Sequence, residues 1–219
     1  MTGPDRERRV FDISPPLTAN LAVFPGDTPL GREVLLRRED GASVTLSTLR
    51  ATVHLGAHVD APSHYGTGAA TIEATPLARL LGPCTVVRPG STAGRVSDED
   101  LADALAGRAP AERVLVATDS YVDPNRWTPG FTSLAPEAID WLAGRGVRTI
   151  GVDTPSVDAA DSKDLPAHAA VLRHGMTILE GLVLADVPSG SYELIALPLR
   201  LVGFDGSPVR AVLRELSPD

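Results

Sequence analysis

The chain has 219 residues, 43% of them hydrophobic, which is enough for one large domain with a buried core. Its 20 basic and 28 acidic residues leave a formal charge of -8, and this balance argues against a nucleic-acid partner, whose phosphates need clustered Lys and Arg. The polar start has no signal-peptide core, and no run of about 18 apolar residues occurs, so we expect a soluble, cytoplasmic protein without a membrane partner.

We expect residues 1–9 to form a flexible N-terminus and residues 10–219 a single domain. The only cysteine, Cys84, cannot form an intrachain disulfide, which fits a reducing compartment. It opens a β-rich run, and we therefore expect a buried structural thiol.

The first third of the chain predicts short strands and a hairpin. Strands are expected over residues 10–14, 33–38 and 43–54, and the turn-rich segment 22–29 is expected to be a loop. The acidic turn 39–42 suits a hairpin between the second and third strands, and the third would carry His54 at its end.

The rest of the chain alternates helices and strands, which is typical of an α/β fold. Ser97 predicts a helix start because its hydroxyl can cap free amides ahead of three acidic residues. Further helical segments are expected over residues 76–81, 136–145 and 167–173, and strands over 84–88, 114–118, 149–153, 177–184, 192–199 and 209–216. Residues 123–130 are expected to form part of a long surface loop.

Three of the five histidines and an aspartate lie within eleven residues: His54, His58, Asp60 and His64. Imidazole nitrogens and a carboxylate oxygen are the ligands that zinc prefers. An extended strand would hold His54 and His58 about 13 Å apart, and in a helix Asp60 would rotate away while Pro62 clashed with the backbone. We therefore expect a metal-binding loop, or a single turn opened at Gly56.

Two alternatives remain open for this stretch. A histidine-rich turn can also serve only to cap and to hydrogen-bond. His64 can be a fourth ligand, a proton carrier or a surface histidine, and spacing alone does not choose among these roles.

Two later residues extend the candidate site. Glu180 lies in an apolar run, where an ionised carboxylate is costly to bury without a cation, although it can also face solvent from a half-exposed strand. His168 can join the same site, but a lone histidine on a helix more often belongs to the surface or the core. His174 precedes Gly175, and we expect it to interact with the helix C-terminus, outside the site.

Five side chains are thus candidates to hold two metal ions, with at least one carboxylate bridging: His54, His58, Asp60, His168 and Glu180. Such pairs of ions, about 3.5–4 Å apart, can clamp a hydrolytic transition state. The sequence contains no nucleophile elbow, phosphate loop or dinucleotide fingerprint, so metal-assisted hydrolysis is the reaction class that we expect.

Residues 54–64, which read His-Leu-Gly-Ala-His-Val-Asp-Ala-Pro-Ser-His, resemble the HxGTHxDxPxH motif of the cyclase-like metal-dependent hydrolases. Among these they resemble the bacterial enzymes that hydrolyse N-formyl-L-kynurenine to L-kynurenine and formate in tryptophan catabolism. The likeness extends over nearly the whole chain, through residues 11–17, 24–28, 81–84, 151–156, 161–163, 174–176, 179–182, 192–199 and 207–213.

The resemblance implies an amidase with two zinc ions per subunit that acts on a linear amide. By residue, it places His54 and His58 on one ion, His168 on the other, and Asp60 and Glu180 between both. It makes His64 the proton donor and acceptor. It also implies a single compact α/β domain with mixed β-sheets flanked by helices, of the swivelling β/β/α type, which assembles as a homodimer.

Two residues depart from the family pattern. Ala57 stands where the wider family has Thr, and Phe24 stands where a substrate-contacting Trp usually precedes Pro-Gly-Asp-Thr. A phenyl ring can still stack on an anilide, with less area and no indole N–H donor, so we expect Phe24 to contact the substrate ring.

The metal chemistry alone does not select the small-molecule substrate. The alternatives are a related hydrolase of another small amide, ester or cyclic compound, and a catalytically silent metal-binding or regulatory protein. Ser162 and Lys163 lie near His168 in the sequence, and a solvated loop is an equally good interpretation of them.

Overall fold

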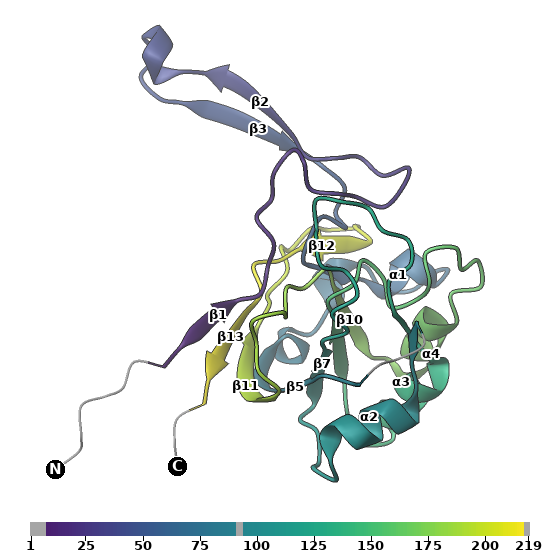
Figure 1. Cartoon of the computed structure of the whole chain (residues 1–219). Coiled ribbons are helices and arrows are strands. Elements are labelled where there is room, and N and C mark those ends of the chain that lie inside the picture. Colours follow the sequence, from purple (N-terminus) through teal and green to yellow (C-terminus); the bar gives the residue numbers. More distant parts are fainter. Residues whose placement is uncertain (1–7, 91–93, 217–219) are drawn as a thin grey trace, which may run out of the picture.

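A curled, mixed sheet of nine strands organises the chain (Figure 1). The computed structural model describes residues 8–90 and 94–216. From edge to edge the strands are β1 (Val10–Asp12), β13 (Val212–Glu215), β11 (Gly190–Ile195), β5 (Leu81–Val87), β7 (Arg113–Val116), β9 (Thr149–Val152), β10 (Thr177–Glu180), β4 (His58–Asp60) and β12 (Gly206–Pro208). The centre of the sheet is parallel and consists of β5, β7, β9 and β10. All other pairs of neighbouring strands in this sheet are antiparallel.

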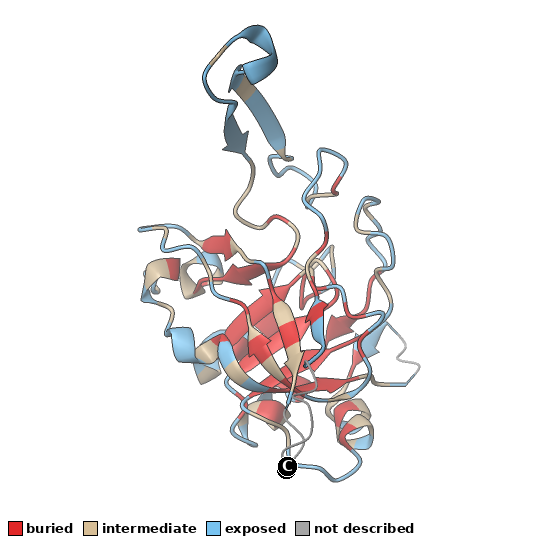
Figure 2. Cartoon of the chain, turned by 90° about the vertical axis from the view of Figure 1, so that its left-hand side faces the viewer, coloured by how far each residue is buried: buried red, intermediate tan, exposed pale blue. Residues whose placement is uncertain are grey.

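Helices pack on one face of this sheet. They are α2 (Asp98–Leu105), α3 (Pro136–Ala143) and α4 (Pro166–His174), and a single turn, α1 (Pro62–Tyr65), follows β4. One buried apolar cluster joins these helices to the sheet, and a second cluster covers the opposite face (Figure 2). The described residues thus form the single mixed α/β domain that the resemblance implies.

Local signals in the sequence account for several of these elements. The expected start of α2 is confirmed, because Ser97 Oγ accepts from the Asp100 amide while the Asp100 carboxylate accepts from the Ser97 amide. Gly175 ends α4 in the left-handed conformation, as expected for a helix C-terminus. Cys84 is buried as predicted, and this burial raises the pKa of its thiol to about 12.

A long hairpin projects from the body of the molecule (Figure 1). It pairs β2 (Gly31–Leu36) with β3 (Leu46–Arg50), joined by a 3-10 turn, η1 (Arg38–Asp40), and is the hairpin expected from the sequence. Strand β3 ends four residues before His54, however, so the expectation that this strand delivers His54 is wrong. The remaining short elements are η2 (Ile72–Ala74), η3 (Leu77–Arg79) and the parallel pair β6 (Arg95–Val96) and β8 (Ser133–Leu134).

The predicted flexible N-terminus falls largely on residues 1–7, which lie outside the described residues. Within the described part of the chain, no helix has both the length and the apolar character needed to cross a membrane.

Candidate metal centre

Strands β4 and β10 bring three donor side chains together. Because alternate residues of a strand face the same side, His58 and Asp60 point the same way while Val59 enters the core. Glu180, at the end of β10, is the cross-strand partner of His58. The loop expected around these residues is therefore wrong for His58 and Asp60: the chain curls before His58, at Gly56, and then continues as a strand.

Two glycines allow this part of the backbone to pack closely. A Cβ atom at Gly181, directly after Glu180, would lie 2.1 Å from the Gly56 carbonyl oxygen. Both residues have positive φ, +58° at Gly56 and +65° at Gly181, a conformation that favours glycine. The chain can therefore turn sharply at Gly56 and bring His54 beside the end of β10.

Helix α4 supplies His168 from its first turn. The helix begins at Pro166 without a cap from its own N-cap residue, and the Asp158 carboxylate instead accepts from the amides of Ala167 and His168, at 2.9 and 3.0 Å. Asp158 also lies 2.7 Å from His168 Nδ1. One carboxylate thus completes the helix end and orients the imidazole.

His54 and His64 lie at the more open side of the cluster. His54 Nδ1 is 2.9 Å from Asp60 Oδ1, and its Nε2 is 2.9 Å from Asp205 Oδ2. His64, with 37% of its side chain exposed, places Nδ1 3.4 Å from the same Asp205 oxygen. The rings of His54 and His64 have centroids 4.1 Å apart.

Each of the three histidines proposed as metal ligands, His54, His58 and His168, has one ring nitrogen that contacts a group outside the donor set. His58 Nδ1 donates to the Gly56 carbonyl at 2.8 Å, His168 Nδ1 to Asp158, and His54 Nε2 to Asp205. The opposite nitrogen of every ring faces the central carboxylates, and it would present its lone pair to a metal bound between them. This is the arrangement by which ligand histidines are usually oriented around a metal.

The electrostatics of the cluster favour bound positive charge. Burial lowers the pKa of the His58 and His168 imidazoles, but hydrogen bonds to the surrounding carboxylates outweigh it and raise each pKa to about 10. Burial would raise the pKa of the Asp60 carboxyl, but the three surrounding imidazoles hold it well below its ordinary value. Two carboxylates buried side by side, Asp60 and Glu180, thus need cations close to them.

The donor set fits a metal. His58 Nε2 is 3.4 Å from Asp60 Oδ1 and from Glu180 Oε2, and His168 Nε2 is 3.4 Å from Asp60 Oδ2. Donor atoms that share one tetrahedral zinc ion lie about 3.4 Å apart, given bonds of about 2.0–2.1 Å. Asp60 Oδ2 and His168 Nε2 are also buried without a hydrogen-bond partner, which a cation between them would remedy.

The structure brings all six metal and proton-transfer candidates of the sequence into one cluster: His54, His58, Asp60, His64, His168 and Glu180. Glu180 is buried, so the half-exposed strand considered for it is wrong. His174 lies outside the cluster as expected, but its Nε2 contacts Asp140 Oδ1 at 2.7 Å. Sequence reasoning missed Asp158 and Asp205, whose partners are set only by the folded chain.

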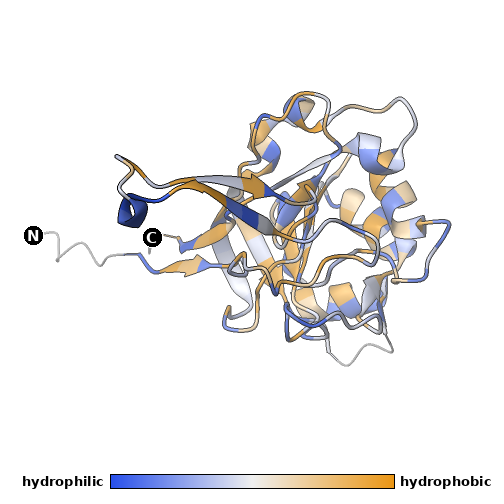
Figure 3. Ribbon diagram, turned by 90° about the horizontal axis from the view of Figure 1, so that it is seen from above, coloured by the Kyte–Doolittle hydropathy of each residue, from blue (hydrophilic) through white to orange (hydrophobic). Residues whose placement is uncertain are grey.

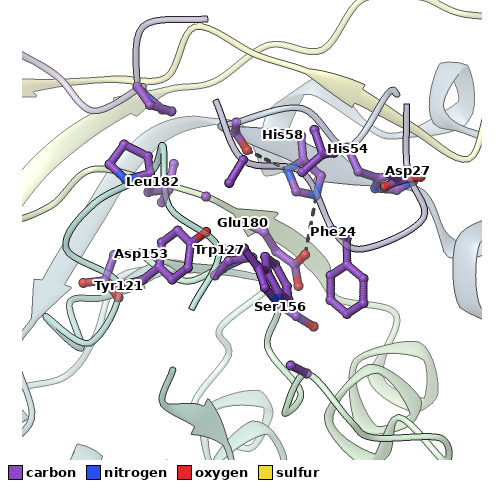
Figure 4. Close-up of a pocket in the computed structure, with 18 of the residues that line it drawn as sticks. Phe24, Asp27, His54, His58, Tyr121, Trp127, Asp153, Ser156, Glu180 and Leu182 are labelled. Atoms are coloured by element: carbon purple, nitrogen blue, oxygen red, sulfur yellow. Dashed lines mark hydrogen bonds and ion pairs between the residues drawn. The ribbon is translucent and has the colours of Figure 1, made fainter. Parts of the chain in front are cut away.

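A pocket of about 850 Å³ leads to this cluster (Figure 4). His54, His58, His64, His168 and Glu180 all line it, so the donor atoms can be reached from solvent. Phe24 lines the same pocket, as does Trp127, whose ring lies beside that of Phe24. The arrangement combines a buried group of metal donors, a more exposed histidine and an aromatic wall.

Known proteins resemble this chain over nearly all of its length. A family described as "Putative cyclase" matches residues 11–159. The kynurenine formamidase of Bordetella pertussis is 50% identical over 210 residues, which are 96% of this chain and 100% of that protein. Among solved structures, a potential metal-dependent hydrolase with cyclase activity is 29% identical, with a TM-score of 0.81 over 96% of this chain and 100% of that one.

A more distant structure shares the fold. Isatin hydrolase A from Ralstonia solanacearum is 22% identical, with a TM-score of 0.80 over 95% of this chain and 92% of that one.

Proposed function

The chain belongs to the family described as "Putative cyclase", and we propose that it is a kynurenine formamidase, or arylformamidase. It hydrolyses the linear amide of N-formyl-L-kynurenine to give L-kynurenine and formate, a step of tryptophan catabolism. The observation that carries this proposal is the near-full-length likeness to the Bordetella pertussis enzyme. The complete donor set at the end of the pocket supports it.

We further propose two zinc ions per subunit. One is held by His54 and His58 and the other by His168, with Asp60 and Glu180 shared. The oxygens of both carboxylates support this division, because Asp60 Oδ1 and Glu180 Oε2 face His58 while Asp60 Oδ2 and Glu180 Oε1 face His168. The ratio of metal to active protein tests it: two equivalents per chain are expected, and one equivalent would require a simpler site.

The metals, when bound, would supply Lewis acidity that polarises the formyl carbonyl and lowers the pKa of water. The chain's own residues have distinct tasks. His64 carries the proton that the departing aryl nitrogen must gain as the C–N bond breaks, and its partial exposure lets it exchange protons with solvent. Asp205 lies next to His64 Nδ1 and favours the tautomer that carries its proton on Nδ1. The Nε2 atom faces away from this carboxylate.

Phe24 is the proposed ring contact for the substrate. Its ring lines the pocket and remains 38% exposed, so an aryl group can stack against it. Phe24→Ala should lower kcat/KM for N-formyl-L-kynurenine, and an unchanged value would show that this ring does not contact the substrate.

Formate release with and without a chelator tests the function. Metal-dependent turnover of N-formyl-L-kynurenine is expected. Turnover only of other small amides, esters or cyclic compounds would support a related hydrolase with a different substrate. Phe24, in place of the usual Trp, keeps this alternative open. No turnover of any of these by metal-loaded protein would support a catalytically silent metal-binding protein.

We also propose a homodimer, formed through the projecting hairpin. Five aliphatic side chains of this hairpin are at least 45% exposed: Leu35, Leu36, Val44, Leu46 and Leu49. Hydrophobic segments of the hairpin strands appear in orange in Figure 3. A two-stranded hairpin is marginal on its own, and such an apolar surface is typical of an interface. Leu49→Asp should convert dimers to monomers in sedimentation analysis, whereas Leu77→Asp, at an exposed site outside the hairpin, should not. The cytoplasmic location stays a prediction.

A further inference from the structure

The loop over residues 118–132 places an indole in the pocket. Trp127 packs edge-on against Phe24, with ring centroids 4.8 Å apart and planes at 66°. Figure 4 shows both rings in the pocket that is also lined by Glu180 and the donor histidines. The sequence predicted this segment as surface loop, and nothing in its composition assigned Trp127 a role.

The position of this indole is held by bonds at several points of the loop. The Ala22 amide donates to the Pro124 carbonyl at 2.9 Å, which ties the loop to the segment that carries Phe24. At the ends of the loop, Asp153 accepts from the Thr118 amide, and Ser120 Oγ accepts from the Thr132 amide at 2.8 Å. The two rings therefore form one preorganised wall, which lowers the entropy that a bound aryl group must overcome.

Basic side chains are scarce around this pocket. Lys163 is the only Lys or Arg among the described residues that line it. Several lining carboxylates already have protein partners, since Asp119 pairs with Arg88, Asp153 accepts from Thr118, and Asp205 contacts His54. Lys163 is exposed and forms no ion pair with any carboxylate of the described residues.

We propose that the pocket recognises its substrate at two subsites: the Trp127 and Phe24 rings hold the aryl group, and the Lys163 ammonium holds the α-carboxylate. This inference rests on the proposed function and identifies the residues that select an aryl amino acid over a simple aryl formamide. The aryl subsite acts on every anilide, since stacking does not depend on charge. The carboxylate subsite acts only on a substrate that carries this group.

Two substrates and two variants separate the subsites. N-formyl-L-kynurenine carries the amino acid side chain, whereas formanilide has the same aryl formamide without it. Trp127→Ala should lower kcat/KM about tenfold for both substrates, and Trp127→Phe should restore most of the loss. Lys163→Met should lower kcat/KM about five- to tenfold for N-formyl-L-kynurenine only, and Lys163→Arg should restore it.

Matched controls exist for both changes. Trp141 lies outside the pocket, where it stacks on Arg145, so Trp141→Ala should leave both kcat/KM values within about twofold. Arg126 neighbours Trp127 but does not line the pocket, so Arg126→Met tests whether any nearby positive charge suffices. Added salt should reduce the preference of the wild type for N-formyl-L-kynurenine over formanilide. The preference of the Lys163→Met variant should not change with salt.

The possible failures are distinct. An equal loss for both substrates in Lys163→Met would overturn the carboxylate subsite, because it would mean that the change disturbs the neighbouring metal centre. Unchanged kinetics in Trp127→Ala would overturn the aryl subsite. If the metal-loaded wild type released no formate from N-formyl-L-kynurenine, the proposed function would fail and this inference with it.

Discussion

Replacing Asp158 by Ala should weaken metal binding although Asp158 is not itself one of the proposed metal ligands. Its carboxylate accepts three hydrogen bonds, from His168 Nδ1 at 2.7 Å and from the backbone amides of Ala167 and His168. The first bond selects the tautomer whose Nε2 lone pair faces Asp60. Removing such an outer partner typically costs about 10–100-fold in metal affinity, or about 1.4–2.7 kcal/mol.

The same change should also destabilise the metal-free protein, because two amides at the start of α4 lose their acceptor, at a cost of about 1 kcal/mol. Asp100→Ala is the matched control, since Asp100 accepts bonds at the start of α2, away from the metal centre. Competition with a chromophoric chelator measures metal affinity, and urea denaturation measures the free energy of unfolding. Asp158→Asn should fall between wild type and Asp158→Ala. A folded Asp158→Ala protein with wild-type metal affinity would refute the orienting role.

Three further predictions concern the same centre. His64→Ala should keep its metal content and lose about 10²–10⁴-fold in turnover, and full activity in the metal-loaded variant would exclude the proton-transfer role. Folding raises the pKa values of His58 and His168 from 6.5 to about 10, so their protonation stabilises the metal-free protein fully below pH 6.5, and this contribution is lost as the pH rises towards 10. Urea denaturation with a chelator should show this fall in the free energy of unfolding. Metal-loaded protein, whose imidazoles are already deprotonated, should not show it. Gly181→Ala should lower the free energy of unfolding by about 3 kcal/mol or more, because the new Cβ would meet backbone atoms. Gly203→Ala, also at positive φ but in open space, should lower it by only about 1–2 kcal/mol in the same assay.

The identity of the donor residues was predictable because it follows from residue types and spacings that can be read in the sequence. Three closely spaced histidines with an aspartate offer the ligand types that zinc prefers, and Glu180 stands out as a carboxylate in an apolar run. The helix starts were predictable for a similar reason, since Ser97 and its acidic neighbours act within one turn. Interactions between residues close in sequence leave a local pattern.

The conformation of the metal-binding stretch was not predictable in the same way. Strand β4 has only three residues, and no alternating pattern of that length can be distinguished from a loop. It is a strand because β10 and β12 pair with it on either side, and both follow much later in the chain. Asp158 and Asp205 were missed for the same reason, since each meets its histidine only after the sheet and α4 are in place.

The centre and the pocket differ in how they are built, and this difference bears on specificity. The metal donors His58, Asp60 and Glu180 lie on two paired strands inside the sheet, where a change in one backbone position displaces the others. The side chains proposed to recognise the substrate, Trp127 and Lys163, lie instead on loops that line the pocket. Loops tolerate substitution without disturbing the sheet, so the substrate can change while the metal chemistry is retained. On this reasoning, Lys163 variants should alter the ratio of kcat/KM values between N-formyl-L-kynurenine and formanilide, and Trp127 variants should lower both values, each with little effect on metal affinity. Variants in β4 or β10 should lower metal affinity and, with it, the kcat/KM values of both substrates.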